Sequence, residues 1–319
     1  MDRIEKGRFE WVGPDSKGSD GISRPSVTFW QDAMRRLLKN KAALVCGIVI
    51  LVFAVISIVI PMVSHFNINE QHYGHMNAPA NTVCDQADHE GQMHILGTDD
   101  LGRDLFTRLW SGGRVSLFIA VVAVLINCFI GIVYGGISGY LGGAVDNVMM
   151  RIVEIINGIP YLMIVILLKM IVGTADPTGV TSLIVAYAAV GWTGMARLVR
   201  GQIVGLKEQE FVVAARALGA GAPRLIAKHL IPNSLSIIIV NITLQIPNAI
   251  FTEAFLSFIG MGVTIPYCSW GSLTSDAILV FQQYPIQLLF PAVCISLTML
   301  SFNLLGDGLR DALDPRLRR

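Results

Sequence analysis

The sequence predicts an all-α polytopic membrane protein with about six transmembrane helices. Of its 319 residues, 53% are hydrophobic and only 15% are charged, and long apolar stretches recur along the chain. Soluble domains carry about 25% charged residues, so this deficit indicates a bilayer as the solvent. The net charge of +1 is too small to attract nucleic acid electrostatically, and no nucleic-acid partner is expected.

Apolar stretches of roughly 20 residues are long enough to cross a bilayer as helices. The stretches that qualify are residues 42–63, 115–140, 155–172, 178–195, 230–252 and 286–306. The third is apolar except for Lys169, whose ammonium we expect to reach outward to the interface. Arg151 and Glu154 precede it and are expected to anchor an inner helix end.

The distribution of Lys and Arg predicts the orientation, because these residues collect on the cytoplasmic side. With the N-terminus inside, the inner segments hold roughly 20 of the 24 basic residues, against about 3 in the outer segments. Both termini are therefore expected in the cytoplasm. The expected organisation is a cytoplasmic tail (1–41), a first helix (42–63), an extracytoplasmic loop (64–114), a core with the other spans (115–306) and a cytoplasmic tail (307–319).

A polar, basic segment, residues 208–232, separates two apolar stretches. Apolar residues recur at helical spacing in its first half: Phe211, Val212, Ala215 and Leu218. Gly219 and Gly221 can end that helix, and Pro223 can open a second one. These signals predict two short helices around a glycine hinge, a knob (residues 211–226) within a cytoplasmic loop (197–229). The alternative is an amphipathic helix that lies on lipid.

This segment resembles the EAA loop of ABC importer permeases, in which EAA, three residues, a glycine and nine residues precede I-x-L-P. Here Ala214 and Ala215 lead to Gly219 at the family's spacing. Three positions depart from the pattern: Val213 replaces Glu, His229 replaces Ile and Ile231 replaces Leu. The resemblance implies an ATPase-coupling surface, and we hypothesise that Glu210 supplies the missing acid. The candidate coupling residues are Glu210, Ala214, Ala215, Arg216, Gly219, Ile231 and Pro232.

Further segments resemble the C-type subunit of dipeptide and oligopeptide permeases. They are H-x-LGTD-x-x-GRD-x-x-x-R from His94 to Arg108, LSF-x-G-x-G…P…WG from Leu256 to Gly271, and the tail at 303–318. The resemblance implies the type I ABC importer permease fold and a multi-pass protein of a prokaryotic plasma membrane. It also implies a B-type permease partner, two ATPase subunits that hold ATP and Mg²⁺, and an extracytoplasmic substrate-binding protein. A nickel importer of the same family is the alternative.

Charged residues ahead of the second span are spaced to pair along a short helix: Asp99, Asp100, Arg103, Asp104 and Arg108. One interpretation is a self-neutralised surface helix. The other is an outer gate or a docking element for the binding protein, together with Glu253 and Trp270. Glu253 is the candidate for lining the pathway, because intramembrane charges are usually functional. The broken apolar segment 253–285 is expected to line the outer mouth.

Neither a metal site nor a catalytic residue is predicted. The loop 64–114 contains several possible ligands, namely His65, His72, His75, His89, His94 and Cys84, but their spacing matches no compact ligand pattern. The chain has no GxxxxGK[ST] phosphate loop and no ordered Ser/His/Asp set, so we expect no hydrolysis and no cofactor in this chain. A self-sufficient secondary transporter or channel, driven by a gradient, is the competing hypothesis from another class.

Overall fold

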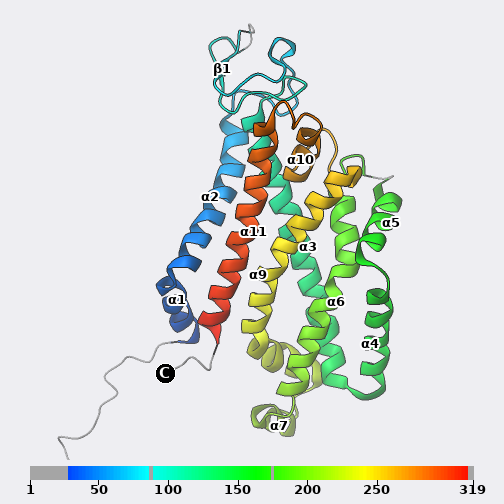
Figure 1. The fold of residues 1–319 in the computed structure, drawn as a ribbon. Helices are drawn as coiled ribbons and strands as arrows, with labels where there is room; N and C mark the ends of the chain where they lie inside the picture. The colour runs from blue at the N-terminus through cyan, green and yellow to red at the C-terminus, as the bar shows by residue number, and fades with distance from the viewer. Residues whose placement is uncertain (1–27, 86–88, 174–175, 315–319) are drawn as a thin grey trace, which may run out of the picture.

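A computed structural model describes residues 28–85, 89–173 and 176–314. The described part is a bundle of long helices that carries a loop-rich segment at one end and short helices at the other (Figure 1). Five helical stretches are long and apolar enough to cross a membrane: Lys41–Val63 (α2), Leu105–Leu141 (α3), Val180–Leu206 (α6), Ala222–Met261, which contains α9 (Ile231–Leu256), and Pro285–Leu313 (α11). With one bent pair as a further span, the prediction of about six spans is confirmed.

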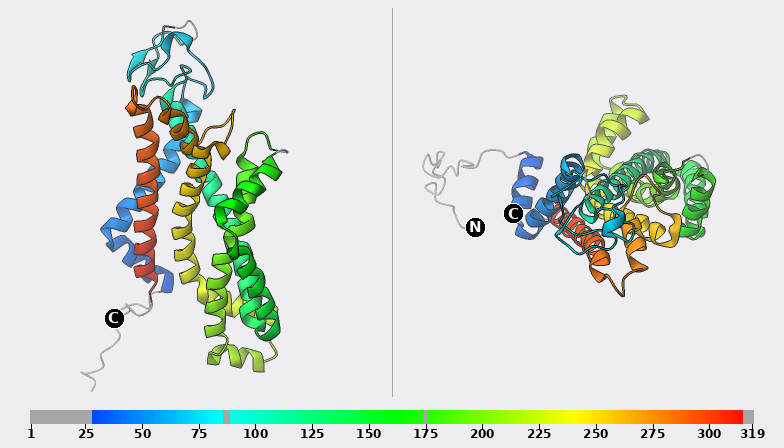
Figure 2. Two further views of the ribbon diagram at one scale, coloured as in Figure 1. Left: turned by 45° about the vertical axis from the view of Figure 1, so that its right-hand side comes forward. Right: turned by 90° about the horizontal axis from the view of Figure 1, so that it is seen from above.

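The shorter elements lie between and beside these spans. They are α1 (Phe29–Lys39), η2 (Tyr73–His75), β1 (Thr82–Val83), β2 (Met93–His94), α4 (Gly143–Gly158), α5 (Tyr161–Gly173), α7 (Glu210–Ala217), α8 (Ala222–Leu225), η3 (Ile226–Leu230), η4 (Ser257–Met261) and α10 (Trp270–Ile278). The two strands pair antiparallel. Figures 1 and 2 place α2 and α11 on one side of the bundle and α4 and α5 on the other, with α3 between them.

Most spans have limits that differ from the expected ones; those expected at 230–252 and 286–306, for example, lie within the helical stretches Ala222–Met261 and Pro285–Leu313. The span expected at 115–140 begins at Leu105, because the Asp104 carboxylate accepts a hydrogen bond from the Thr107 N–H (2.8 Å) and caps the helix. The span expected at 155–172 is two helices, α4 and α5, bent by 85°. Pro160 lies two residues after the end of α4 and has no N–H with which to continue its hydrogen-bond ladder. The span expected at 178–195 continues to Leu206.

Close packing of α3 on α6 forms the centre of the bundle. Gly131, Gly135 and Gly139 lie one turn apart on α3. A Cβ atom at Gly131 would approach the Met195 Cβ to 2.6 Å, and one at Gly135 would collide with the backbone oxygen of Ala196. The helices can approach this closely only because these positions lack side chains.

Replacement of Gly135 by leucine is therefore expected to push α3 away from α6. Overpacking of this kind lowers the free energy of unfolding by typically about 2 kcal/mol. The measurement is the unfolding temperature of the purified chain in detergent. Gly201→Leu on α6 is the matched control, since a Cβ atom at Gly201 meets no heavy atom of the described residues within 4 Å. Equal shifts for the two variants would contradict this account of the packing.

Candidate functional site

The helix α7 projects from one end of the bundle, beyond the ends of α6 and α9 (Figure 1). Glu210 opens it, where a carboxylate complements the positive end of the helix dipole. It ends in a Schellman motif: the Ala220 N–H donates to the Ala215 oxygen (3.1 Å), and the Gly219 N–H donates to the Arg216 oxygen (2.9 Å). Gly219 has φ +85°, a conformation that side chains disfavour, so the motif selects glycine there.

Only one narrow face of α7 is buried. Val212 is fully buried in a cluster with Val199, Ile203 and Leu225, and Ala215 packs partly against that cluster. The four apolar residues at helical spacing do not all lie on the buried side. Two of them face outward, because the short helix meets α6 and α8 on one side alone: Phe211 is 42% exposed and Leu218 is 89% exposed.

The outward face of the knob is apolar and small. Ala214 and Gly219 are exposed there, and Val213, which stands at the family's acidic position, is 51% exposed. The Arg216 guanidinium lies 5.7 Å from the centre of the Tyr140 ring, which ties the exposed helix back to the end of α3. An exposed apolar surface of this kind is typical of a protein-binding site.

The second half of the knob belongs to a spanning helix. Helical structure is continuous from residue 222 through α8, η3 and α9 to the break at Gly260, so Ile231 and Pro232 lie at the start of α9 rather than at the end of a loop. Ile231 is half-buried and Pro232 is exposed. The preceding turn, η3, is a π-helix in which the Ile231 N–H donates to the Ile226 oxygen. Such a wide turn beside a proline, which has no N–H to donate, is a common helix irregularity.

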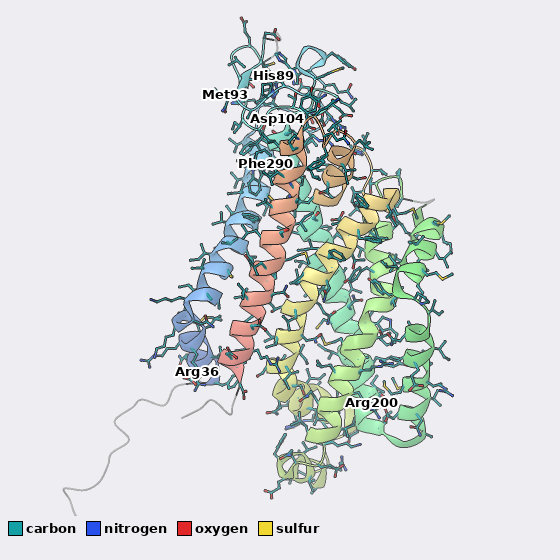
Figure 3. The ribbon with its side chains drawn as sticks, viewed as in Figure 1. Arg36, His89, Met93, Asp104, Arg200 and Phe290 are labelled. Atoms are coloured by element: carbon teal, nitrogen blue, oxygen red, sulfur yellow. The ribbon has the colours of Figure 1, made fainter. Side chains whose placement is uncertain are left out.

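A partly buried ion pair near the knob was not foreseen from the sequence. The Arg200 guanidinium of α6 forms two hydrogen bonds of 2.5 Å with the Asp146 carboxylate of α4, and Ser138 of α3 donates to the same carboxylate (2.5 Å). Figure 3 shows Arg200 at the end of the bundle that carries α7. The partners are 54 residues apart, and no local spacing signals such a pair. This bidentate pair fixes α4 against α6.

Charged residues at the opposite end form a compact cluster. The Asp99 carboxylate binds the Arg103 Nε at 2.7 Å and lies 3.6 Å from the Arg108 Nε. The Arg108 guanidinium also contacts Asp276 at 3.4 Å, a residue of α10 that the sequence reasoning missed. Burial raises the pKa of Asp276, whereas the charges of Arg108 and Arg103 act to lower it.

The predicted surface helix at these residues is wrong. Residues 98–104 form a loop in which the Asp99 Oδ1 accepts the backbone N–H groups of Leu101 (3.0 Å) and Arg103 (2.9 Å). Asp99, Arg103 and Arg108 are all buried. Spacing by three or four residues is shared by a helix and by such a turn, and the self-capping carboxylate selects the turn.

Glu253 and Trp270 lie inside the subunit between α3, α9 and α10. The Glu253 carboxylate accepts hydrogen bonds from Ser116 and Ser257, both 2.8 Å. The Trp270 Nε1 donates to the Leu109 oxygen (2.9 Å), and its side chain is fully buried. These bonds fix the outer segments against α3. A pathway role for Glu253 and a docking role for Trp270 stay predictions.

Lys169 does not reach outward as expected. It is 9% exposed, and its ammonium donates to the backbone oxygens of Met261 and Gly262. Met261 ends η4 and Gly262 follows it, and the helix does not continue there to supply partners for these carbonyl groups, because Gly260 departs from helical geometry with φ +80°. The lysine thereby fastens α5 to the break that follows α9.

A cleft of ≈ 590 Å³ lies beside the charged cluster, and we call it the outer cleft after the outer mouth that the sequence predicts there. It is lined by Asp100, Leu101, Arg103 and Arg108 from one segment and by residues between Val263 and Leu279 from the other. The two segments that the sequence predicts at the outer mouth thus meet at one cleft. The Cys268 thiol of one segment donates a hydrogen bond to the Arg108 oxygen of the other, and these two residues are 160 positions apart in the sequence.

A helical bundle with a cleft at one end and an exposed helical knob at the other defines a multi-pass membrane protein built to contact other proteins. The chain belongs to the family of binding-protein-dependent transport system inner membrane components, whose model matches residues 131–319. The model for the N-terminal TM domain of oligopeptide transport permease C matches residues 28–80. The predicted membrane location and importer permease fold are confirmed.

Several curated proteins are similar over nearly the whole chain. The dipeptide transport system permease protein DppC of Bacillus subtilis is 46% identical over 305 residues, which cover 95% of this chain and 91% of that protein. The oligopeptide transport system permease protein OppC of Bacillus subtilis is 43% identical over 319 residues, and both chains are covered in full. OppC of Escherichia coli is 41% identical over 300 residues, 94% of this chain and 95% of that protein.

Proposed function

We propose that this chain is a transmembrane permease subunit of an ATP-driven importer for oligopeptides or dipeptides. The observation that carries the proposal is its similarity to peptide permeases over 91% or more of their length. Those proteins are named for dipeptide and oligopeptide transport, which favours peptides over nickel as the substrate. The chain would form half of the pathway, with a homologous B-type permease as the other half.

The knob supports the coupling role. It presents Ala214, Gly219 and Leu218 outward, so a partner can approach its backbone closely. Its buried residue Val212 connects α7 to α6. We assign this surface to an ATPase subunit, which holds the ATP and Mg²⁺, one of two in the complex. Motion of the knob is then passed to the spans by packing on one side and by the continuous helix into α9 on the other.

The outer cleft supports contact with a substrate-binding protein. It lies at the end of the bundle opposite the knob. The helix α1 and the C-terminal end of α11 lie at the same end of the bundle as the knob (Figure 1). With the knob in the cytoplasm, α1 and that end of α11 are cytoplasmic too, in agreement with the count of basic residues. The cleft then opens to the outside, where the binding protein delivers peptide.

Reconstitution of the co-purified complex in liposomes tests the proposal. Uptake of a labelled peptide is expected to require the binding protein, both ATPase subunits and ATP. Liposomes that contain this chain alone serve as the control and should show no uptake. Gradient-driven uptake by this chain alone would refute the proposal in favour of a secondary transporter. ATP-driven uptake of labelled nickel without peptide uptake would move the substrate to nickel.

A further inference from the structure

Three metal-ligating side chains meet inside the end loop, which we define as residues 64–104. His72, Cys84 and His94 are all buried, and their ligand atoms lie within 4.8 Å of one another. The Cys84 Sγ is 3.8 Å from the His72 Nδ1. Ligand bonds of about 2.0–2.3 Å in tetrahedral zinc sites place the ligand atoms about 3.3–3.8 Å apart. The three side chains are therefore within a small closing movement of a zinc geometry.

The strand pairing of β1 and β2 brings two of these ligands to one face. Thr82 pairs with His94, so Cys84, two residues after Thr82, lies diagonally beside His94 on the same face. Val83 and Met93 point to the other face and are exposed. The sequence spacing between the ligands is long because a turn separates the strands, and for that reason it matched no compact ligand pattern.

His72 reaches the same point from a different part of the end loop. It directly precedes η2, and its N–H donates to the Gly102 oxygen at 3.1 Å. A Cβ atom at Gly102 would collide with the His72 backbone. The absence of a side chain at Gly102 therefore lets the backbone of His72 settle against the 98–104 loop, which fixes the start of its side chain.

His94 is oriented in the way that metal-ligating histidines usually are. Its Nδ1 lies 2.9 Å from the Asp104 Oδ1, while its Nε2 is buried and has no hydrogen-bond partner among the described residues. An imidazole that donates its Nδ1–H to a carboxylate presents the lone pair of Nε2 to a cation. The other Asp104 oxygen caps α3, so this histidine connects the cluster to the first turn of a spanning helix.

The surroundings of the cluster agree with a metal site. The ring of Phe66 stacks on His94 with 4.2 Å between ring centres, which shields one side from water. His89, labelled in Figure 3, lies next to the cluster, but its two nitrogens already bond Gln92 (3.2 Å) and Glu70 (2.9 Å). We therefore leave the fourth ligand position to water. All five cysteines of the chain are free, so Cys84 is not committed to a disulfide.

We propose that His72, Cys84 and His94 bind a divalent cation of the zinc type and that Asp104 orients His94 for this purpose. Two imidazoles and one thiolate are a ligand set that suits Zn²⁺ rather than Mg²⁺ or Ca²⁺. Within the described residues, the regular structure of the end loop is limited to two strands of two residues each and one short turn of helix. Small segments with so little core are commonly held by a metal or a disulfide. The ion would be a structural staple beside the outer cleft.

Metal analysis of the intact transporter complex tests this proposal. After removal of metals with a chelator and dialysis against Zn²⁺, we expect about one zinc per chain by mass spectrometry. Cys84→Ser and His94→Ala are expected to lose it. His65→Ala is the matched control, since His65 is an exposed histidine of the same end loop and lies outside the cluster. Retention of zinc by Cys84→Ser, or no zinc in the unmodified chain, would overturn the assignment.

Two further measurements do not depend on whether those variants fold. Co²⁺ bound to the unmodified chain should show thiolate-to-cobalt charge-transfer absorption, and its absence would exclude Cys84 as a ligand. Asp104→Asn keeps an N-cap for α3, because asparagine caps as well as aspartate. We expect it to weaken zinc affinity about 10–100-fold, the usual effect of removing an outer carboxylate partner, with metal-free stability unchanged. Unchanged affinity would contradict the role of Asp104.

Discussion

A tryptophan at Gly219 is expected to abolish ATP-driven uptake while the chain still folds and inserts. A Cβ atom at this position meets no heavy atom of the described residues within 4 Å, so the new side chain would project from the knob beside Leu218. The left-handed backbone costs about 1 kcal/mol for a residue other than glycine, too little to unfold the chain. The bulky ring would instead keep a partner from the backbone of the knob. Co-purification of the ATPase subunits and peptide uptake are the measurements.

Gly219→Asn is the control for that experiment. Asparagine tolerates the left-handed conformation better than other side chains, and it is short. It should retain most of the ATPase binding that the tryptophan variant loses. Full uptake by Gly219→Trp would refute docking by shape. Equal loss of both variants from the membrane fraction would show instead that Gly219 serves the fold.

Removal of the Asp99 carboxylate is expected to give the largest loss of stability. Asp99→Ala leaves Arg103 and Arg108 buried with only exposed acids near them, Asp276 and, 3.9 Å from Arg103, Asp100. Two backbone N–H groups also lose their acceptor. Breaking a buried ion pair on one side typically costs about 3–5 kcal/mol. The free energy of unfolding in denaturant, or the unfolding temperature of the purified chain, measures this loss.

The neighbouring residue Asp100 provides a matched control. Its side chain is 51% exposed and approaches Arg103 only to 3.9 Å, so Asp100→Ala should change stability by about 1 kcal/mol or less. A double variant that also replaces Arg103 by methionine should recover part of the loss in Asp99→Ala, because one unpaired buried charge is removed. Similar losses of stability for Asp99→Ala and Asp100→Ala would show that the Asp99 ion pairs contribute no more than exposed ion pairs do.

The spans could be predicted because a helix that crosses a bilayer needs about 20 consecutive apolar residues, which are visible in the sequence. The limits of the spans could not be predicted, since the sequence does not show whether a charged residue near a span lies outside the helix or is neutralised within it. In the sequence Arg108 interrupts the apolar pattern, yet it lies at the end of the first turn of α3, where Asp99 and Asp276 neutralise it. Lys169 was expected to reach water, but the break after α9 provides carbonyl acceptors instead. Such partners lie far away in sequence, and no local pattern contains them.

The knob was predictable to a different extent. Gly219 and Pro223 gave its turn and the start of its second helix, because both residues act through local backbone geometry. Which side of α7 is buried depends on where α6 and α8 lie, and helical spacing alone does not show that Phe211 is exposed. The ligand cluster of the end loop illustrates the same limit. His72, Cys84 and His94 meet only through strand register and a distant turn.

The helical continuity of residues 222–259, up to the break at Gly260, has a mechanical consequence. At about 1.5 Å per residue this stretch is roughly 55 Å long, so a tilt of about 5° about one end displaces the other end by about 5 Å. Force applied to the knob at Arg224 would travel through covalent backbone and hydrogen-bonded turns, whereas force applied to α7 must cross the side-chain contacts of Val212. The first route therefore transmits motion through a rigid helix and not through side-chain contacts that can rearrange. Its two π-helical turns, η3 and η4, lie at either end of α9 and are the places where such a helix can bend.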